Sequence, residues 1–307
     1  MKAAYFMKHG GPEVMRFGDV PDPVAGPGQL LIDVYAASVN GADWRVRAGT
    51  NATVKAFPYI PGRDFSGVIS ALGEGVSEFA VGDEVFGVCD IGQEAAYAEK
   101  IAIRSELVAR KPVGLSHMEC AAMALIGLTG LCSIEDSLQL KFGETILIQG
   151  GAGGVASFAL QLAKHIGARV ITTASAANLD YVRTLGADQV IDYNAQDFTK
   201  VVSGCDAVFD TVGGDVAPRC FAVLRPGGRA AFVGSRHVVP VSPRPDLASL
   251  RPIVGRDRAH LDRTTALVTG GAVRVPQITS YSLSEAAAAH VVSEGRHLRG
   301  KLVFRVR

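Results

Sequence analysis

One glycine-rich segment constrains the fold of this chain more than any other part of the sequence. Residues 151–156 read Gly-Ala-Gly-Gly-Val-Ala, which fits the pattern G-x-G-x-x-A, and they lie between an apolar run at 145–149 and an apolar stretch at 155–166. The first glycine of such a pattern permits a tight turn, the second lets the backbone approach a pyrophosphate, and the small last residue keeps helix and strand close. Amide groups at the helix N-terminus then hold the phosphates. The segment therefore predicts a dinucleotide-binding turn between a strand and a helix.

The sequence around this turn alternates between strand and helix patterns. Such alternation predicts a parallel, doubly wound sheet with helices on both faces. Strand patterns occur at 145–149, 169–173, 189–191, 206–210 and 228–233, and helical patterns occur at 155–166 and 179–185.

The residues before position 112 have a different character. Short strand patterns at 30–36, 67–72 and 84–88 are separated by glycine and proline turns, which is typical of a small barrel or sandwich. Ser116 followed by Glu119 fits a capping box and predicts that a helix begins there. The C-terminal part returns to mixed structure. Helices are expected at 261–268 and 284–293 and a last strand at 301–304.

The loop after the second strand of the nucleotide unit bears on the choice of cofactor. A site for NAD usually places an acidic residue there to bind the ribose 2′-hydroxyl. Residues 172–178 contain no acid, and Asp180 is expected within the next helix. Small hydroxyl residues such as Thr173 and Ser175 leave room for a 2′-phosphate and can donate hydrogen bonds to it. The loop therefore favours NADP, although it contains no lysine or arginine.

Seven short segments distributed along the chain carry a family resemblance. Each is unspecific alone, but their order and spacing are specific. On these segments the chain resembles the medium-chain dehydrogenase/reductase superfamily, in its zinc-independent quinone oxidoreductase and enoyl reductase branch. The segments are N-x-x-D-x-x-x-R-x-G at 40–49, P-G-x-D-x-x-G-x at 61–68, and the blocks at 96–99, 127–129, 210–214, 225–228 and 299–303.

The resemblance implies an α/β architecture in which one domain is inserted into another. A Rossmann doubly wound parallel sheet domain at 123–258 is expected inside a mainly β, GroES-like barrel catalytic domain formed by 1–122 and 259–307. The resemblance also implies NADPH as the hydride donor and a homodimer.

The same resemblance implies roles for individual residues. Asn40 and Thr129 are expected near the nicotinamide as the catalytic candidates, and Tyr193 is expected to contact the 2′-phosphate or to be a partly buried tyrosine at the end of the sheet. The full set of predicted cofactor-binding residues is Gly151, Ala152, Gly153, Gly154, Val155, Thr173, Ser175, Tyr193, Val212, Gly234 and Lys301.

The residues do not fit the zinc sites of the wider superfamily. Catalytic zinc needs Cys and His ligands with one position open. The expected cysteine is absent from residues 40–43, and Arg63 stands where a histidine is expected after Pro61-Gly62. The chain also runs from Cys89 to Ala98 without a second cysteine, so the four-cysteine structural lobe is missing. No metal is predicted.

The predicted function is NADPH-dependent reduction of a quinone, enone or alkenal without zinc. Some relatives carry a tyrosine as proton donor, but Trp44 and Arg45 occupy that stretch here. Trp44 either shapes a pocket for a planar acceptor or packs ordinarily, and Arg45 and Arg63 either supply positive charge or form structural ion pairs. Two alternatives stay open. One is an enoyl-thioester reductase, which would need a basic patch to bind its carrier; the arginines at 244–263 could form one, but aspartates lie among them. The other is a non-catalytic NADPH-binding protein.

Composition bears on which classes of partner and which cellular compartment are expected. The formal net charge is +1 and no basic stripe occurs, so a nucleic-acid partner is not expected. The N-terminus lacks the apolar core of a signal peptide, and no run reaches about 18 apolar residues, so no membrane partner is expected. The five cysteines form no C-x-x-C pair, which favours a reducing compartment and a cytoplasmic location.

Overall fold

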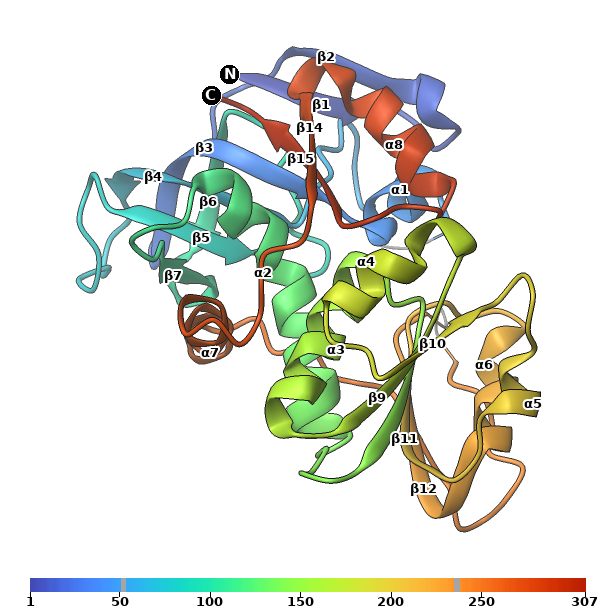
Figure 1. Ribbon diagram of the computed structural model, residues 1–307. Coiled ribbons are helices and arrows are strands. Elements are labelled where there is room, and N and C mark those ends of the chain that lie inside the picture. The colour runs from blue at the N-terminus through green and yellow to red at the C-terminus, as the bar shows by residue number, and fades with distance from the viewer. Residues whose placement is uncertain (51–53, 235–237) are drawn as a thin grey trace. The chain divides into compact units, whose positions relative to one another are not determined.

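The computed structural model describes residues 1–50, 54–234 and 238–307 of the chain (Figure 1). The chain divides into two compact units, which we call unit 1 and unit 2. Unit 1 comprises Met1–Leu125, Arg256–Thr265 and Val275–Arg307, and unit 2 comprises Ile126–Gly255 and Ala266–Arg274.

Among its described residues, unit 2 is built on a six-stranded parallel sheet with the order β10-β9-β8-β11-β12-β13. The strand order reverses at β8, as in a doubly wound sheet that binds ligands at the carboxyl ends of its strands. The predicted fold class is therefore confirmed. The strands are β8 (Thr145–Gln149), β9 (Arg169–Ala174), β10 (Gln189–Asp192), β11 (Cys205–Asp210), β12 (Leu224–Phe232) and β13 (Ala248–Leu250).

Helices cover both faces of this sheet (Figure 1). Ile146 and Ile148 of β8 pack in one apolar cluster with α3, while Leu147 between them packs in another cluster with Phe198 of α5. Successive side chains of a strand point to opposite faces, so a strand that is apolar throughout must be covered on both sides. The helices are α3 (Gly154–Ile166), α4 (Leu179–Thr184), α5 (Phe198–Val201) and α6 (Val216–Arg219).

Unit 1 is mainly β, as expected. In its described part, a seven-stranded sheet contains the long strand β3, which pairs in antiparallel fashion with β4, β6 and β15, and β1 and β2 form a separate hairpin. Leu30, Ile32 and Val34 of β3 are fully buried in the core. The strands are β1 (Lys2–Phe6), β2 (Met15–Asp19), β3 (Gln29–Val39), β4 (Asp64–Leu72), β5 (Glu84–Val88), β6 (Lys100–Arg104), β7 (Val108–Arg110), β14 (Ile278–Ser282) and β15 (Lys301–Arg305).

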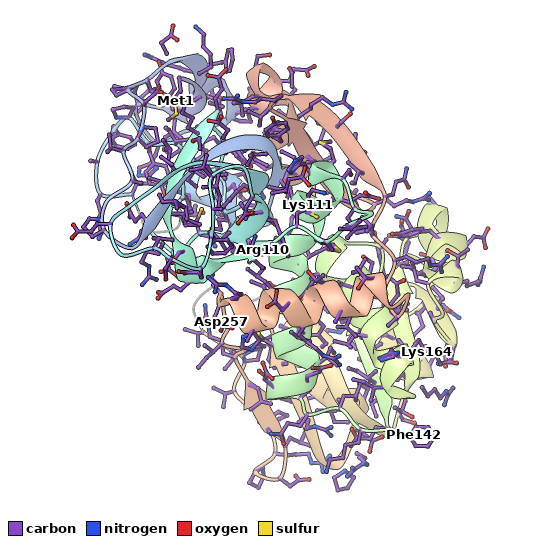
Figure 2. The ribbon with its side chains drawn as sticks, turned by 90° about the vertical axis from the view of Figure 1, so that its left-hand side faces the viewer. Met1, Arg110, Lys111, Phe142, Lys164 and Asp257 are labelled. Atoms are coloured by element: carbon purple, nitrogen blue, oxygen red, sulfur yellow. The ribbon has the colours of Figure 1, made fainter. Side chains whose placement is uncertain are left out.

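Helices α1, α7 and α8 begin within unit 1 at polar residues. Helix α1 (Gly41–Arg47) follows Asn40, and α8 (Ala286–Glu294) follows Glu285. Asp257 lies at the start of α7 (Arg258–Thr269), where its carboxylate accepts a hydrogen bond from the N–H of His260 at 3.1 Å (Figure 2). Satisfying such an otherwise unpaired N–H stabilises a helix N-terminus.

Helix α2 (His117–Leu131) begins at the predicted capping box. The Ser116 N–H donates to Glu119 Oε2 at 2.8 Å, and the Glu119 N–H donates to Ser116 Oγ at 3.2 Å. The helix continues in wider, π-helical turns over Cys132–Ser137. By length and composition His117–Ser137 is apolar enough to cross a membrane, but 78% of its most apolar stretch is buried within the protein, as in a core helix.

Candidate functional site

Two glycines carry the chain from β8 into α3. Gly150 has a φ of +78°, which favours glycine, and its N–H donates to Thr173 Oγ1 at 3.0 Å. The Gly151 N–H donates to the Thr173 carbonyl at 2.9 Å, and a Cβ on Gly151 would lie 2.3 Å from Thr172 Oγ1. Glycine at 151 therefore lets the turn lie directly against β9.

Helix α3 begins without a side-chain cap. Its N-cap residue is Gly153, which has extended backbone and no polar side chain. The amides of Gly154, Val155 and Ala156 lie in the first turn, where a helix offers no acceptor of its own. These amides and the helix dipole make the start of α3 suitable for an anion such as a phosphate.

The end of β9 carries small polar residues rather than an acid. Ser175 follows β9, and its hydroxyl accepts a hydrogen bond from Asn178 Nδ2 at 3.1 Å. Asp180 lies in α4, where its exposed carboxylate is 2.7 Å from Arg183 Nη1. Tyr193 follows β10 and donates its backbone N–H to the Ala174 carbonyl at 3.2 Å, while its side chain is 46% exposed. Ser175 and Tyr193 therefore flank the same end of β9.

The carboxyl end of β11 lies beside the glycine turn. Asp210 is fully buried and its carboxylate accepts hydrogen bonds from the N–H groups of Val212, at 2.9 Å, and Gly213, at 3.1 Å. A Cβ on Gly150 would be 3.1 Å from Val212 Cγ2, and a Cβ on Gly234 would be 2.5 Å from the Gly213 nitrogen. These close approaches bring Val212 and Gly234 to the same sheet edge as the turn.

Lys301, Asn40 and Asp64 form a buried polar centre in unit 1. Lys301 Nζ donates to Asn40 Oδ1 at 2.7 Å, and Asn40 Nδ2 donates to Asp64 Oδ1 at 2.7 Å. Asp64 Oδ1 also accepts from Ser38 Oγ at 2.8 Å. Burial lowers the pKa of Lys301, and the negative charges of Asp64 and Asp43 partly offset this. Burial likewise raises the pKa of Asp64, against the charge of Lys301. The Asn40 amide is therefore fixed between two opposite charges.

A second buried carboxylate, Asp43, lies on α1. Asp43 Oδ2 accepts from the N–H of Asn40 at 2.9 Å and from the Tyr97 hydroxyl at 2.8 Å. Burial raises the pKa of Asp43 to about 6, although the positive charge of Arg63 acts in the opposite direction. The hydrogen bond to Asn40 ties this carboxylate to the centre formed by Lys301 and Asp64.

Arg63 precedes β4 and carries its charge into the same region. Its Nη2 lies 3.0 Å from Glu94 Oε1, and its Nε lies 3.9 Å from Asp43 Oδ1. Glu94 is itself buried, and its Oε2 accepts hydrogen bonds from the Tyr59 hydroxyl and from the N–H of Gly92. Of the two roles weighed for Arg63, the ion pair is therefore present. Arg45 stacks over Trp44, with its guanidinium carbon 5.2 Å from the ring centroid.

The predicted site residues fall in two groups. The glycine turn, Ser175, Tyr193, Val212 and Gly234 lie at the carboxyl edge of the unit 2 sheet, and their contact with a cofactor stays a prediction. Thr173 is buried there, and its hydroxyl donates to Gln149 Oε1 at 2.7 Å, so it shapes the turn and its contact with a cofactor stays a prediction.

The remaining predicted residues belong to other elements. Lys301 is buried in unit 1 against Asn40, and its assignment to the cofactor also stays a prediction. Thr129 lies in α2 within unit 2, with its carbonyl accepting from Ser133 Oγ at 2.6 Å. Sequence reasoning missed the buried acids Asp43 and Asp64. Both are the acidic positions of the segments at 40–49 and 61–68, and that is the signal that was available.

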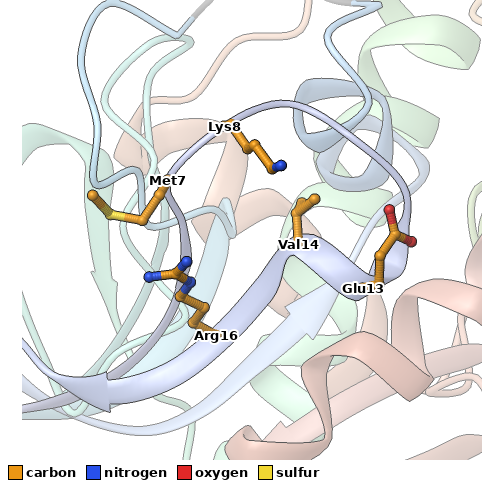
Figure 3. A pocket seen from close by; sticks show the side chains of 5 residues that line it. All are labelled: Met7, Lys8, Glu13, Val14 and Arg16. Atoms are coloured by element: carbon orange, nitrogen blue, oxygen red, sulfur yellow. The ribbon is translucent and has the colours of Figure 1, made fainter.

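A hollow elsewhere in unit 1 contains none of the predicted site residues. It has a volume of about 200 Å³ and lies where the chain passes from β1 to β2 (Figure 3). Its walls are mostly charged, so it lacks the apolar lining that is usual for small-molecule sites. The lining residues are Met7, Lys8, Glu13, Val14 and Arg16.

Comparison with known families matches most of the chain. Residues 26–159 match the alcohol dehydrogenase GroES-like domain, and residues 185–304 match a family described as zinc-binding dehydrogenase. A quinone oxidoreductase from Sus scrofa is 30% identical over 99% of this chain and 97% of its own length. An NADPH-dependent alkenal/one oxidoreductase from Arabidopsis thaliana is 31% identical over 99% of this chain and 79% of its own length. A 2-methylene-furan-3-one reductase from Solanum lycopersicum is 35% identical over 74% of this chain, which spans 61% of that relative.

Solved structures resemble the whole chain. A quinone oxidoreductase from Coxiella burnetii has a TM-score of 0.95 and 35% identity, and covers 100% of this chain with 99% of its own. A quinone oxidoreductase from Escherichia coli in complex with NADPH has a TM-score of 0.91 and 25% identity, with 100% of both chains covered. These likenesses extend over both units rather than over the nucleotide motif alone.

Proposed function

Because this chain belongs to the medium-chain dehydrogenase/reductase superfamily, in its quinone oxidoreductase-like branch, we propose that it is an NADPH-dependent oxidoreductase that reduces a quinone, enone or alkenal. The observation that carries this proposal is the β8–α3 turn. Its uncapped helix N-terminus opens at the carboxyl edge of a doubly wound sheet. Bound NADPH supplies the hydride, while the protein binds and orients both reactants.

The residues of unit 2 fit NADPH. The amides of Gly154 and Val155 and the small Gly153 would hold the pyrophosphate, because the turn brings backbone rather than side chains to that position. The end of β9 lacks an acid, and Ser175 and the exposed Tyr193 flank it. A hydroxyl and a phenol can donate to a 2′-phosphate, which a carboxylate would repel. The remaining contacts are assigned to Ala152, Thr173, Val212, Gly234 and Lys301.

Nucleotide binding and catalysis are assigned to different segments of the chain. We assign nucleotide binding to the segment 123–258 and catalysis to the segments 1–122 and 259–307. Asn40 and Thr129 remain the candidates for orienting the nicotinamide or the acceptor. The amide of Asn40 has its oxygen bound to Lys301 and one N–H bound to Asp64, so it would enter the reaction already oriented. Fixed donors of this kind stabilise a developing oxyanion without having to reorient.

Zinc independence is supported by the chemistry of the donors around Arg63. No cysteine occurs in residues 40–43, where one is expected, and the expected histidine position holds a guanidinium paired with Glu94. A guanidinium stays protonated and cannot ligate a metal, and its charge repels a cation. The description of one matching family as zinc-binding therefore does not extend to these residues.

We further propose that the protein is a homodimer and that it is located in the cytoplasm. Strand β13 lies at an edge of the unit 2 sheet, and the flanking side chains of Val241 and Ile253 are 89% and 87% exposed. An open sheet edge with apolar neighbours suits pairing with a second copy. The cysteines of the chain are all free, which suits a reducing compartment. The partner in the reaction is a small-molecule acceptor, with no nucleic acid or membrane proposed.

Turnover with a panel of acceptors tests the function. NADPH and NADH are each mixed with 1,4-benzoquinone, 9,10-phenanthrenequinone, an alkenal and crotonyl thioester, and oxidation is followed at the nicotinamide absorbance band. We expect oxidation of NADPH by quinones or enones. Faster turnover of the thioester would favour the enoyl-thioester reductase. Saturable NADPH binding without oxidation by any acceptor would favour the non-catalytic protein.

A further inference from the structure

Two arginines of unit 1, Arg63 and Arg256, are anchored to the same backbone segment. Arg256 Nη1 donates to the carbonyl oxygen of Cys89 at 2.9 Å, and the N–H of Cys89 donates to the carbonyl oxygen of Arg63 at 2.7 Å. Burial lowers the pKa of Arg256, and the charge of Arg63 lowers it further. The two positive groups are therefore close enough to repel each other.

Several donors of this pair are buried without a hydrogen-bond acceptor in the described part of the chain. They are Nε and Nη2 of Arg63 and Nε of Arg256. Arg63 Nη2 lies 3.0 Å from Glu94 Oε1 without forming an aligned hydrogen bond. Buried charged donors without acceptors are costly, and a second cation nearby adds to the cost. An anion that accepts from both guanidinium groups would remove both penalties.

The neighbouring acids do not fill this role. Glu94 directs Oε2 to Tyr59 and Gly92, and Asp43 directs Oδ2 to Asn40 and Tyr97. The remaining oxygens, Glu94 Oε1 and Asp43 Oδ1, have no hydrogen-bond partner among the described residues. Asp43 Oδ1 is 3.9 Å from Arg63 Nε, which is too far for a hydrogen bond.

A third nearby acid, Asp90, is paired with a different arginine. Asp90 forms an ion pair with Arg104. Arg256 accordingly has no ion pair with an acid of its own in the part of the chain that the structure describes. The pair of arginines thus includes one buried guanidinium, that of Arg256, whose charge is not offset by an ion pair of its own among the described residues.

We propose that Arg63 and Arg256 form an anion subsite that receives a carboxylate of the acceptor, so that the preferred acceptors are α,β-unsaturated carbonyl compounds with a free carboxylate. This assignment rests on the proposed reductase function. A guanidinium presents its N–H groups in a planar fork that matches the two oxygens of a carboxylate. Reduction moves the hydride of NADPH to the carbon β to the conjugated carbonyl group and a proton from water to the α-carbon, leaving NADP⁺ and hydroxide, so the carboxylate keeps its charge throughout.

A matched pair of acceptors tests the subsite. The acid 4-oxopent-2-enoate and its methyl ester share the conjugated ketone and differ in the charge. We expect the wild-type protein to favour the acid in kcat/KM, and Arg256→Gln to reduce the acid-to-ester ratio roughly ten- to hundredfold, the range for a hydrogen bond to a charged group. Arg63→Lys keeps the charge but loses the fork, and should reduce the same ratio. A ratio near one in the wild type, or one that both variants leave unchanged, would overturn the subsite.

Arg110→Gln is the matched control. It removes one positive charge from the same unit, at a side chain that is 57% exposed and paired with Asp83. Surface pairs of this kind contribute little to stability. The control should leave the acid-to-ester ratio as in the wild type, and an equal fall of the ratio in the control would show a general charge effect and contradict the subsite.

A binding experiment separates the subsite from the reaction. The saturated acid 4-oxopentanoate has no carbon–carbon double bond that could accept a hydride. Its binding to the NADPH-loaded protein can therefore be measured by calorimetry without turnover of a double bond. We expect binding that Arg256→Gln weakens at least tenfold, and weaker binding of the methyl ester. Binding that depends on Arg256 without NADPH oxidation by any acceptor would leave the anion site standing and overturn the reductase function. Turnover of both acceptors with no such dependence would do the reverse.

Discussion

Lys301 Nζ lies 2.7 Å from Asn40 Oδ1 and 2.8 Å from the carbonyl oxygen of Val39, so the first residue of β15 is tied to the end of β3. A buried cation from the C-terminal part of the chain thereby binds the end of a strand from its N-terminal part. Asp64, which accepts from the same Asn40 amide, balances that charge. The orientation of Asn40 therefore depends on both charges at once.

Replacing Lys301 by Met should destabilise the protein by roughly 3–5 kcal/mol, because Asp64 would remain as a buried charge without a counter-charge. Urea unfolding measures the loss. The double substitution Lys301→Met with Asp64→Asn removes both charges and should recover much of it. Lys100→Met, at a partly exposed ion pair with Asp33, is the control and should change stability little. Equal losses for Lys100 and Lys301 would contradict the charge argument.

The two glycines of the motif should respond differently to a single methyl group. Gly151→Ala places a Cβ 2.3 Å from Thr172 Oγ1, so the turn must shift and stability should fall by about 1–3 kcal/mol. Gly153→Ala meets nothing closer than Gly150 O at 3.4 Å, so the fold should persist. The added methyl group would still stand at the helix N-terminus and should raise the Kd for NADPH. Thermal unfolding and fluorescence titration together distinguish the two effects, and unchanged NADPH affinity in Gly153→Ala would contradict the assigned phosphate site.

The choice between NADPH and NADH should depend on Ser175. Ser175→Asp adds a carboxylate at the end of β9, where it would repel a 2′-phosphate and could accept from a ribose 2′-hydroxyl. We expect the Kd for NADPH to rise at least tenfold while that for NADH falls. Ser175→Ala serves as the control for loss of the hydroxyl alone. A variant that keeps the cofactor preference of the wild type would place the 2′-phosphate elsewhere.

His290 should make stability depend on pH. It is fully buried on α8, where Nδ1 lies 3.2 Å from Arg47 Nη1, and burial followed by the charge of Arg47 lowers its pKa to about 3. The unfolded chain binds a proton at this histidine below about pH 6.5 and the folded chain does not, so stability is lost as pH falls from 6.5 toward 3.

Replacement of that histidine by a residue that does not titrate provides the measurement. His290→Gln keeps a hydrogen-bond acceptor for Arg47 and removes the titration. Between pH 7.5 and pH 5 the wild-type protein should lose about 2 kcal/mol more unfolding free energy than the variant, since each pH unit below 6.5 costs about 1.4 kcal/mol. Parallel losses in both proteins would show that His290 is not the group that titrates.

The elements that the sequence predicted are those whose signals are local. Strand β8 is apolar throughout, α2 begins with Ser116 and Glu119 in hydrogen-bond reach, and the glycine motif links the two kinds of element in unit 2. Helix α1 was not predicted, because its buried face carries the charged residues Asp43 and Arg47 rather than an apolar stripe. Their partners Tyr97 and Glu294 come from distant parts of the chain.

The candidate site divides in the same way. The residues of the glycine turn are adjacent in sequence, so a motif can find them. The contact between Lys301 and Asn40 spans 261 residues of sequence, and that between Arg256 and Cys89 spans 167. Such contacts depend on how β3, β15 and the loops of unit 1 assemble, and no local pattern records them. Arg63 was recognised as the residue at a zinc-ligand position, but its pairing with Glu94 required the fold.

The most direct test of the account is a single-turnover measurement on metal-free protein. The protein is treated with a chelator, loaded with NADPH or with NADPH deuterated at C4, and mixed with a quinone or an enone in a stopped-flow instrument. We predict that oxidation proceeds at the rate of the untreated protein and that deuterium at the transferred position slows it. Loss of oxidation on chelation with recovery on adding zinc would contradict the account, as would the absence of any oxidation by the NADPH-loaded protein.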